Sequence, residues 1–205
     1  DYSYDESGNR VSRLRRIPVF NLETNQWDTR YSHEFDAPYP QVTHILMNPV
    51  YKDLVFFCHE GTTTEIPDRL WTLNTTTGEQ KNVFEQYNNS TGKTGEPSGH
   101  ENWTADGENL VFVKYNRGTN LGQSGIVRIG KDGDETEYIN GDYDYWHCHP
   151  SSDNRWIVAD TQESLSQDDA LGFRTGPTSI VLVDSKTSTS HPIARVKIGQ
   201  DHPWQ

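Results

Sequence analysis

Short apolar runs alternate with polar turn residues along the chain. Leu54–Cys58, Leu110–Tyr115 and Trp156–Ala159 are almost wholly apolar, and residues such as Gly, Asn and Asp surround them. Runs of this length between turn-forming residues are typical of buried β-strands. No stretch predicts a long helix, so the pattern predicts an all-β fold.

An apolar strand that ends in a polar turn occurs four times. The turns begin at Asn21, Asn74, Gly130 and Asp184, which are 53, 56 and 54 residues apart. A fixed period of about 54 residues indicates a repeat architecture rather than a single irregular sheet.

Each period holds several short strands. In the second period these are Leu54–Cys58, Arg69–Asn74 and Gln80–Phe84, and Leu110–Tyr115 opens the next. Sheets of four antiparallel strands at this spacing are the blades of a β-propeller. We therefore predict that residues 1–205 form a single partial β-propeller domain of about four blades.

Histidines recur at nearly the same period. His44 and His100 are 56 residues apart, and His149, close to His147, follows 49 residues after His100. Each lies just before a turn and an apolar strand, which we expect to be the innermost strand of its blade. Equivalent positions of a repeat lie at equivalent places, so these histidines are predicted to face one end of the propeller axis. A metal or catalytic site is built in this way.

Composition narrows the classes of partner. The formal net charge is −12, which argues against non-specific binding to nucleic acid and against docking on an anionic membrane. Mean hydropathy is −0.87, and no apolar run is long enough to span a bilayer. The two cysteines, Cys58 and Cys148, form no disulfide framework at their spacing, and Cys58 is expected to be a buried strand thiol.

Four short motifs follow one another in the middle of the chain. They are Cys-His-Glu-Gly at 58–61, Asp-Arg-Leu-Trp at 68–71, His-Glu-Asn-Trp at 100–103 followed by Asp-Gly at 106–107, and a later histidine before the Ser-Asp pair at 152–153. This succession resembles the oligogalacturonate lyase family, whose members are seven-bladed β-propellers. The resemblance is strongest over about residues 40–160.

The resemblance implies a β-elimination on short uronic-acid oligomers, assisted by a divalent metal, typically manganese. It implies that His100 is the Brønsted base and Arg69 its partner beside the substrate. His147 would be a metal ligand, with His149 as the alternative, and Gln205 a further ligand.

Other parts of the resemblance are less direct. His59 and His44 would lie near the substrate, although His59 could be architectural and His44 could contact a neighbouring blade. The family is mostly intracellular, so a cytoplasmic location is implied, with a secreted or periplasmic one left open. Self-association, or a remainder of the propeller outside these residues, is a further expectation.

The residue types suit this chemistry. β-Elimination removes the C5 proton of a uronate, and charge that builds next to the carboxylate must be neutralised by a cation or an arginine. A neutral histidine can take the proton near neutral pH. Two alternatives stay open: Arg69 could instead pair with Asp68 or Glu65, and the chain could be a non-catalytic propeller that binds a sugar or a protein.

Overall fold

The computed structural model describes sixteen β-strands. The residues that it describes are 2–4, 7, 10–12, 17–28, 41–60, 68–86, 98–115, 125–161 and 177–197. All regular elements in these ranges are strands, as the apolar pattern predicts. Within the same ranges, no helix has the length and apolar character needed to cross a membrane.

The chain divides into two compact units, residues 1–95 and residues 96–205. The strands of the first unit are β1 (Tyr2–Tyr4), β2 (Arg10–Ser12), β3 (Val19–Asn21), β4 (Gln26–Asp28), β5 (Gln41–Met47), β6 (Leu54–Glu60), β7 (Leu70–Asn74) and β8 (Gln80–Phe84). The strands of the second unit are β9 (Ser98–Trp103), β10 (Asn109–Lys114), β11 (Gly125–Gly130), β12 (Glu137–Asn140), β13 (Tyr145–Pro150), β14 (Trp156–Thr161), β15 (Pro177–Asp184) and β16 (Thr189–Lys197).

The first unit holds one four-stranded antiparallel sheet and two hairpins. The sheet runs β5-β6-β7-β8 in chain order, and β1–β2 and β3–β4 are the hairpins. Strand β6 is apolar from Leu54 to Cys58 and is buried over most of that length. A core of this unit forms where Phe57 and Leu73 pack with Ile17.

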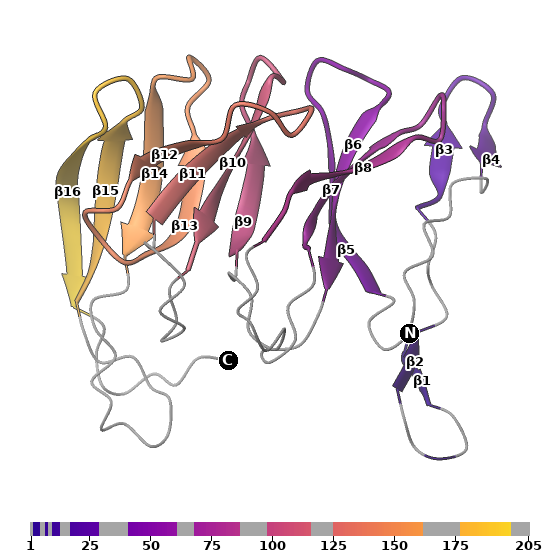
Figure 1. Cartoon of the computed structure of the whole chain (residues 1–205), viewed down its shortest axis with the longest axis horizontal. Helices are drawn as coiled ribbons and strands as arrows, with labels where there is room; N and C mark the ends of the chain where they lie inside the picture. Colours follow the sequence, from indigo (N-terminus) through magenta and orange to yellow (C-terminus); the bar gives the residue numbers. More distant parts are fainter. Residues whose placement is uncertain are drawn as a thin grey trace. The chain divides into compact units, whose positions relative to one another are not determined.

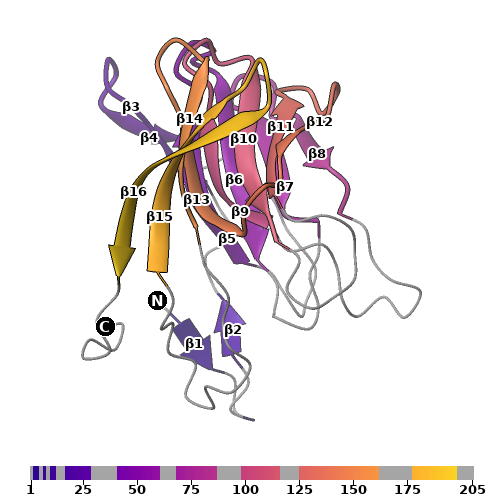
Figure 2. The same ribbon diagram turned by 90° about the vertical axis from the view of Figure 1, so that its left-hand side faces the viewer.

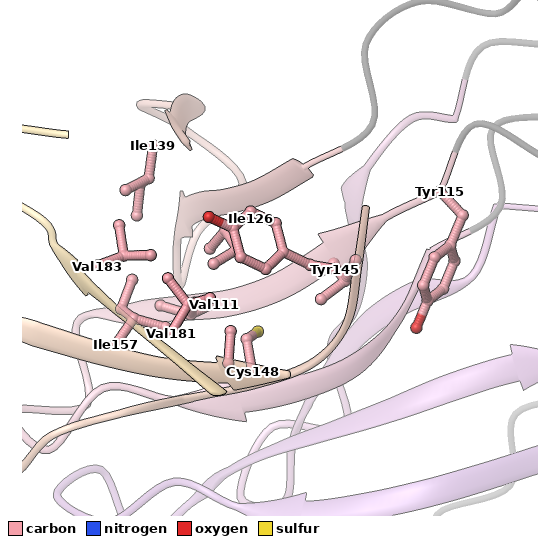
Figure 3. Close-up of a cluster of buried hydrophobic side chains, with 11 residues drawn as sticks. Val111, Tyr115, Ile126, Ile139, Tyr145, Cys148, Ile157, Val181 and Val183 are labelled. Atoms are coloured by element: carbon pink, nitrogen blue, oxygen red, sulfur yellow. The ribbon is translucent and has the colours of Figure 1, made fainter. Parts of the chain in front are cut away.

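The second unit holds two such sheets, β9 to β12 and β13 to β16, each with neighbouring strands paired in chain order (Figures 1 and 2). Strand β13 lies against β9 and β10, so the two sheets share one core. Figure 3 shows that core, with the ring of Tyr145 among aliphatic side chains such as Ile126 and Val111, and Tyr115 at one side of the cluster. Each four-stranded meander is built like a β-propeller blade.

The four repeated turns lie at equivalent places. Each joins the third and fourth strands of a sheet, or the two strands of the β3–β4 hairpin. In two of them a side-chain amide oxygen closes the turn, because Asn21 Oδ1 accepts the amides of residues 23 and 24 and Asn74 Oδ1 accepts those of 76 and 77. Asp184 Oδ1 accepts the amide of residue 186. At Gly130 a Cβ would lie 2.9 Å from the backbone oxygen of Asp134, so a larger residue would force this turn to shift.

Three polar contacts join the sheets of the second unit near the end of β12. Asn140 Nδ2 donates to the backbone oxygen of Ser188 at 2.8 Å, and the Tyr145 hydroxyl donates to Asn140 Oδ1. Ser190 Oγ donates to Asp142 Oδ2 at 2.5 Å. The two sheets are therefore bonded to each other as well as packed.

The histidine-bearing segments differ from the prediction. They are strands, β5, β9 and β13, and each is the first strand of its sheet. The apolar runs that follow are second strands, so the expectation that these runs are the innermost strands is wrong. The polar side chains and a bulge in each first strand conceal the two-residue period that would reveal a strand.

Candidate functional site

A β-bulge interrupts the first strand of all three four-stranded sheets at the same place. In each, two residues of the first strand stand opposite one residue of the second, between regular pairs on either side. The bulges are His44–Ile45 opposite Phe57, His100–Glu101 opposite Phe112, and Trp146–His147 opposite Asp160.

The histidines are equivalent in only two of these sheets. His44 and His100 occupy the first bulge position, where φ is 48° and 58° respectively. In the third sheet Trp146 occupies that position and His147 the next, while His149 lies outside the bulge and pairs with Val158. A positive φ at a residue other than glycine is strained, and such strain is concentrated at functional positions.

His100 and His147 lie together in the second unit. Their ring centroids are 4.0 Å apart, with the ring planes at 68°. The His100 ring also meets Trp146 at 5.7 Å and Tyr115 at 6.3 Å between centroids. Two imidazole rings thus lie together beside two aromatic side chains, where the two sheets meet.

Asp160 orients the His147 ring. Its Oδ2 lies 2.8 Å from His147 Nδ1, and its Oδ1 accepts the backbone N–H of His147 at 2.7 Å. About half of the His147 side chain, 52%, is exposed. The ring is therefore fixed on one side by a carboxylate while about half of the side chain stays accessible.

Side chains from neighbouring strands hold the two bulges against each other. Asn102 Nδ2 donates both to the His100 carbonyl at 3.2 Å and to the Cys148 carbonyl at 2.9 Å. The Tyr115 hydroxyl donates to the Trp146 carbonyl at 2.7 Å. The backbone on which His100 and His147 stand is thus fixed from across the sheet boundary.

Both cysteines are buried thiols outside any disulfide, and burial is what was expected for Cys58. Burial is the main cause that raises the pKa of the Cys148 thiol, and the negative charges of Glu101 and Asp160 raise it further. A thiol held neutral in this way is a poor nucleophile and a poor metal ligand. Its neighbour His149 is exposed, and Nδ1 of His149 lies 2.7 Å from the carbonyl oxygen of Pro150.

A second polar cluster lies in the first unit. Arg69 Nη1 donates to Glu60 Oε2 at 2.6 Å, and His44 Nδ1 lies 3.4 Å from both Arg69 Nη2 and Glu60 Oε1. Thr43 also donates to Glu60. Burial pushes the pKa of Glu60 upward, but the Arg69 charge and the hydrogen bonds outweigh it, so the pKa is lowered from its ordinary value.

The structure gives Arg69 a partner, Glu60, that the sequence reasoning did not name. Glu60, at the end of β6, is a carboxylate that Arg69 binds, and Asp68 accepts the backbone N–H of Gln86 at 2.8 Å. His59 is half-buried on β6, and its amide donates to the Arg69 carbonyl at 2.8 Å. Gln205, like Glu65, lies outside the described residues.

The donor set fits part of a metal site. Within the described ranges, no three side chains of His, Cys, Asp or Glu are grouped so as to hold a metal ion. His147 itself fits a ligand, because a carboxylate on one ring nitrogen leaves the other for a cation, which is the usual second shell of metal-bound histidines. Further ligands would have to come from residues outside this group.

Asp160, Trp146 and Tyr115 are site residues that the sequence reasoning missed. Asp160 is the one acidic residue in the apolar segment Trp156–Thr161, thirteen positions after His147. That isolated acid was the available signal, but only the bulged register shows which residue it faces.

Comparisons with known proteins show the fold. No family model matches this chain, and no curated protein matches it. Among solved structures, an oligogalacturonate lyase in complex with manganese is 21% identical, with a TM-score of 0.67 over 93% of this chain and 43% of that one. The oligogalacturonate lyase of Vibrio parahaemolyticus is 19% identical, with a TM-score of 0.66 over 86% of this chain and 42% of that one.

A putative TolB of Agrobacterium tumefaciens is also similar, at 14% identity, with a TM-score of 0.55 over 96% of this chain and 60% of that one. The structural likeness to oligogalacturonate lyases confirms the resemblance first seen in the motifs, and the fold is that of β-propeller blades. This chain spans less than half the length of the two lyases.

Proposed function

We propose that this protein is a lyase that cleaves short uronic-acid oligomers, of the oligogalacturonate type, by metal-assisted β-elimination. The observation that carries the proposal is the pair of imidazoles on adjacent bulges, one of them oriented by a carboxylate. The likeness in fold to two oligogalacturonate lyases supports it.

His100 is the base in this proposal. It would take the C5 proton of the uronate, and a general base of this kind contributes about 10²–10⁴-fold to the rate. It must be neutral to do so, which the ordinary histidine pKa of about 6.5 allows near neutral pH. The contacts of Asn102 with its carbonyl and of Tyr115 and Trp146 with its ring give it a fixed position.

His147 is the metal ligand in this proposal, with His149 as the alternative and Gln205 as a further ligand. Asp160 occupies Nδ1 of His147, so the bond to a cation would be made through Nε2. A divalent cation, which we propose is manganese, would neutralise charge on the substrate carboxylate when bound.

Arg69 would bind a uronate carboxylate through its guanidinium, and His44 and His59 would lie near the substrate. Glu60 already holds Nη1 of Arg69, which fixes the plane of the guanidinium. A planar guanidinium in a fixed orientation is suited to two parallel hydrogen bonds with a carboxylate.

The charge of the chain constrains how such a substrate would bind. A net charge of −12 repels a polyanion at long range, so the attraction must come from nearby cationic groups. Removal of the metal should therefore weaken substrate binding as well as turnover.

The test is an assay for the unsaturated uronate product by its ultraviolet absorbance, with digalacturonate and Mn²⁺. We expect product to form with the folded protein and to require the metal. The absence of product from folded, manganese-loaded protein would show that the lyase proposal is wrong and favour a propeller that only binds its partner.

Two matched variants separate the roles. His100→Asn should lose about 10²–10⁴-fold in rate and keep its affinity for Mn²⁺. His147→Asn should lose affinity for Mn²⁺ in calorimetry. If His100→Asn keeps full activity, the assignment of the base is wrong while the lyase proposal stands.

A further inference from the structure

One residue opposite a bulge differs in kind from its two counterparts. Phe57 and Phe112 are completely buried. Asp160 takes the same place in the third sheet, and its side chain is 34% exposed. A carboxylate in the place of a buried ring needs polar partners, and both of its oxygens find one in the same residue, His147.

The two contacts act on different parts of His147. A bulge leaves the extra residue outside the regular ladder of backbone hydrogen bonds. Asp160 Oδ1 accepts the backbone N–H of that residue, and Asp160 Oδ2 faces Nδ1 of its ring. One carboxylate thus fixes both where the His147 backbone lies and how its ring is turned.

We propose that Asp160 is a positioning residue that holds His147 in the tautomer with the proton on Nδ1. An ionised carboxylate only accepts hydrogen bonds, so in this pair the imidazole nitrogen must be the donor. The lone pair then resides on Nε2, which becomes the only ring nitrogen able to bind a cation. Manganese as that cation rests on the proposed function, whereas the tautomer does not.

The aromatic neighbours of the ring do not supply this control. His100 and Trp146 meet the His147 ring edge-on, and such contacts leave the position of the ring proton open. In the first unit, Nδ1 of the bulge histidine His44 is shared among Thr43, Glu60 and Arg69 at 2.9 to 3.4 Å. Nδ1 of His147 instead lies 2.8 Å from a single carboxylate oxygen, and this close contact defines one tautomer.

The test is the nitrogen-15 spectrum of the histidine side chains in metal-free protein at about pH 8, above the ordinary histidine pKa of about 6.5. Long-range proton–nitrogen correlations show which ring nitrogen carries the proton. We expect His147 to have its proton on Nδ1. A wild-type spectrum with the proton on Nε2 would overturn the inference without any variant.

Asp160→Asn is the decisive variant. Its amide oxygen can still accept the His147 N–H, but its NH₂ group presents a proton to Nδ1. We expect the His147 proton to move to Nε2, and the affinity for Mn²⁺ alone to fall about 10–100-fold in calorimetry. The matched control is Asp153→Asn in the turn between the same two strands, because Asp153 bonds Ser151 and the Arg155 amide and should leave the tautomer unchanged.

The outcomes separate this inference from the proposed function. If the tautomer changes in Asp160→Asn but neither protein binds Mn²⁺, Asp160 positions His147 as inferred and the metal role of His147 is wrong. If the tautomer is the same in both proteins, the inference is wrong whatever the lyase assay shows.

Discussion

The bulges of β9 and β13 share a backbone register but differ in what they contain. In β9 the first bulge residue, His100, has a positive φ and stands opposite a buried phenylalanine, Phe112. In β13 the histidine is the second bulge residue, and the opposite residue is Asp160. The comparison shows that the same bulge can position a histidine in two ways. In β9 the backbone of the histidine is strained, and in β13 a carboxylate binds the histidine.

We expect the largest effects from exchanging the residue types that stand opposite the two bulges, Phe112 and Asp160. Phe112→Asp places a carboxylate at a fully buried site, and we expect the free energy of unfolding to fall by at least about 4 kcal/mol. Asp160→Phe at the partly exposed site should cost only about 1–2 kcal/mol, because it loses hydrogen bonds but no packing. Urea unfolding measures both, and equal losses would show that the two positions are not distinct.

The next largest effect is expected from replacing Asn102, the hydrogen-bond donor that joins the two bulges. Asn102→Asp turns an N–H donor into an acceptor that faces the carbonyls of His100 and Cys148. We expect a loss of about 2–3 kcal/mol, because two carbonyls lose their donor and meet a negative charge. The same substitution at the exposed Asn25 is the control for the change in charge, and a similar loss there would contradict the assignment.

The difference in backbone strain can be measured with paired substitutions. At His100, Val should be less stable than Asn by about 1–2 kcal/mol, since a β-branched residue tolerates positive φ poorly. At His147, which has no positive φ, Val should be no worse than Asn, because Val suits an extended strand. Thermal unfolding of the four variants gives both differences, and the same order at both sites would show that strain does not distinguish the bulges.

The smallest expected effect concerns the acid of the first unit. The lowered pKa of Glu60 means that this carboxylate contributes stability that is fully present above its ordinary pKa of 4.5 and is lost as pH falls through its lower folded pKa. Glu60→Gln should remove that dependence, with a loss of about 0.2–1 kcal/mol at neutral pH. Unfolding midpoints measured from neutral pH to below 4.5 test this, with Glu85→Gln, an exposed glutamate of the same unit, as control.

The sequence predicted the parts of the fold that depend on local pattern. Leu54–Cys58 and Gln80–Phe84 are strands because apolar and turn-forming residues alternate at strand length, and the turns at Asn21 and Asn74 close through their own side chains. Strand β13 escaped prediction because a bulge inserts a residue that breaks the period of two.

Site partners were harder to predict than strands. Sequence reasoning named Asp68 and Glu65 as carboxylates for Arg69, whereas the antiparallel pairing of β6 with β7 brings Glu60 to it. Asp160 faces His147 only because the register shifts by one residue between Tyr145 and Cys148. Such contacts depend on register, which no local pattern in one sequence fixes.

The bonds of Asn140 and Asn102 also bear on how the second unit opens. The Asn140 side chain donates a hydrogen bond to the turn before β16, and the Asn102 side chain donates one to β13. The two sheets that these bonds join also form the shared core. A sheet fastened to its neighbour in this way cannot detach without exposing that core. The backbone amide hydrogens of β10 and β14 should therefore exchange with solvent through the same opening of the unit. In hydrogen exchange the two strands should behave as a single cooperative folding unit.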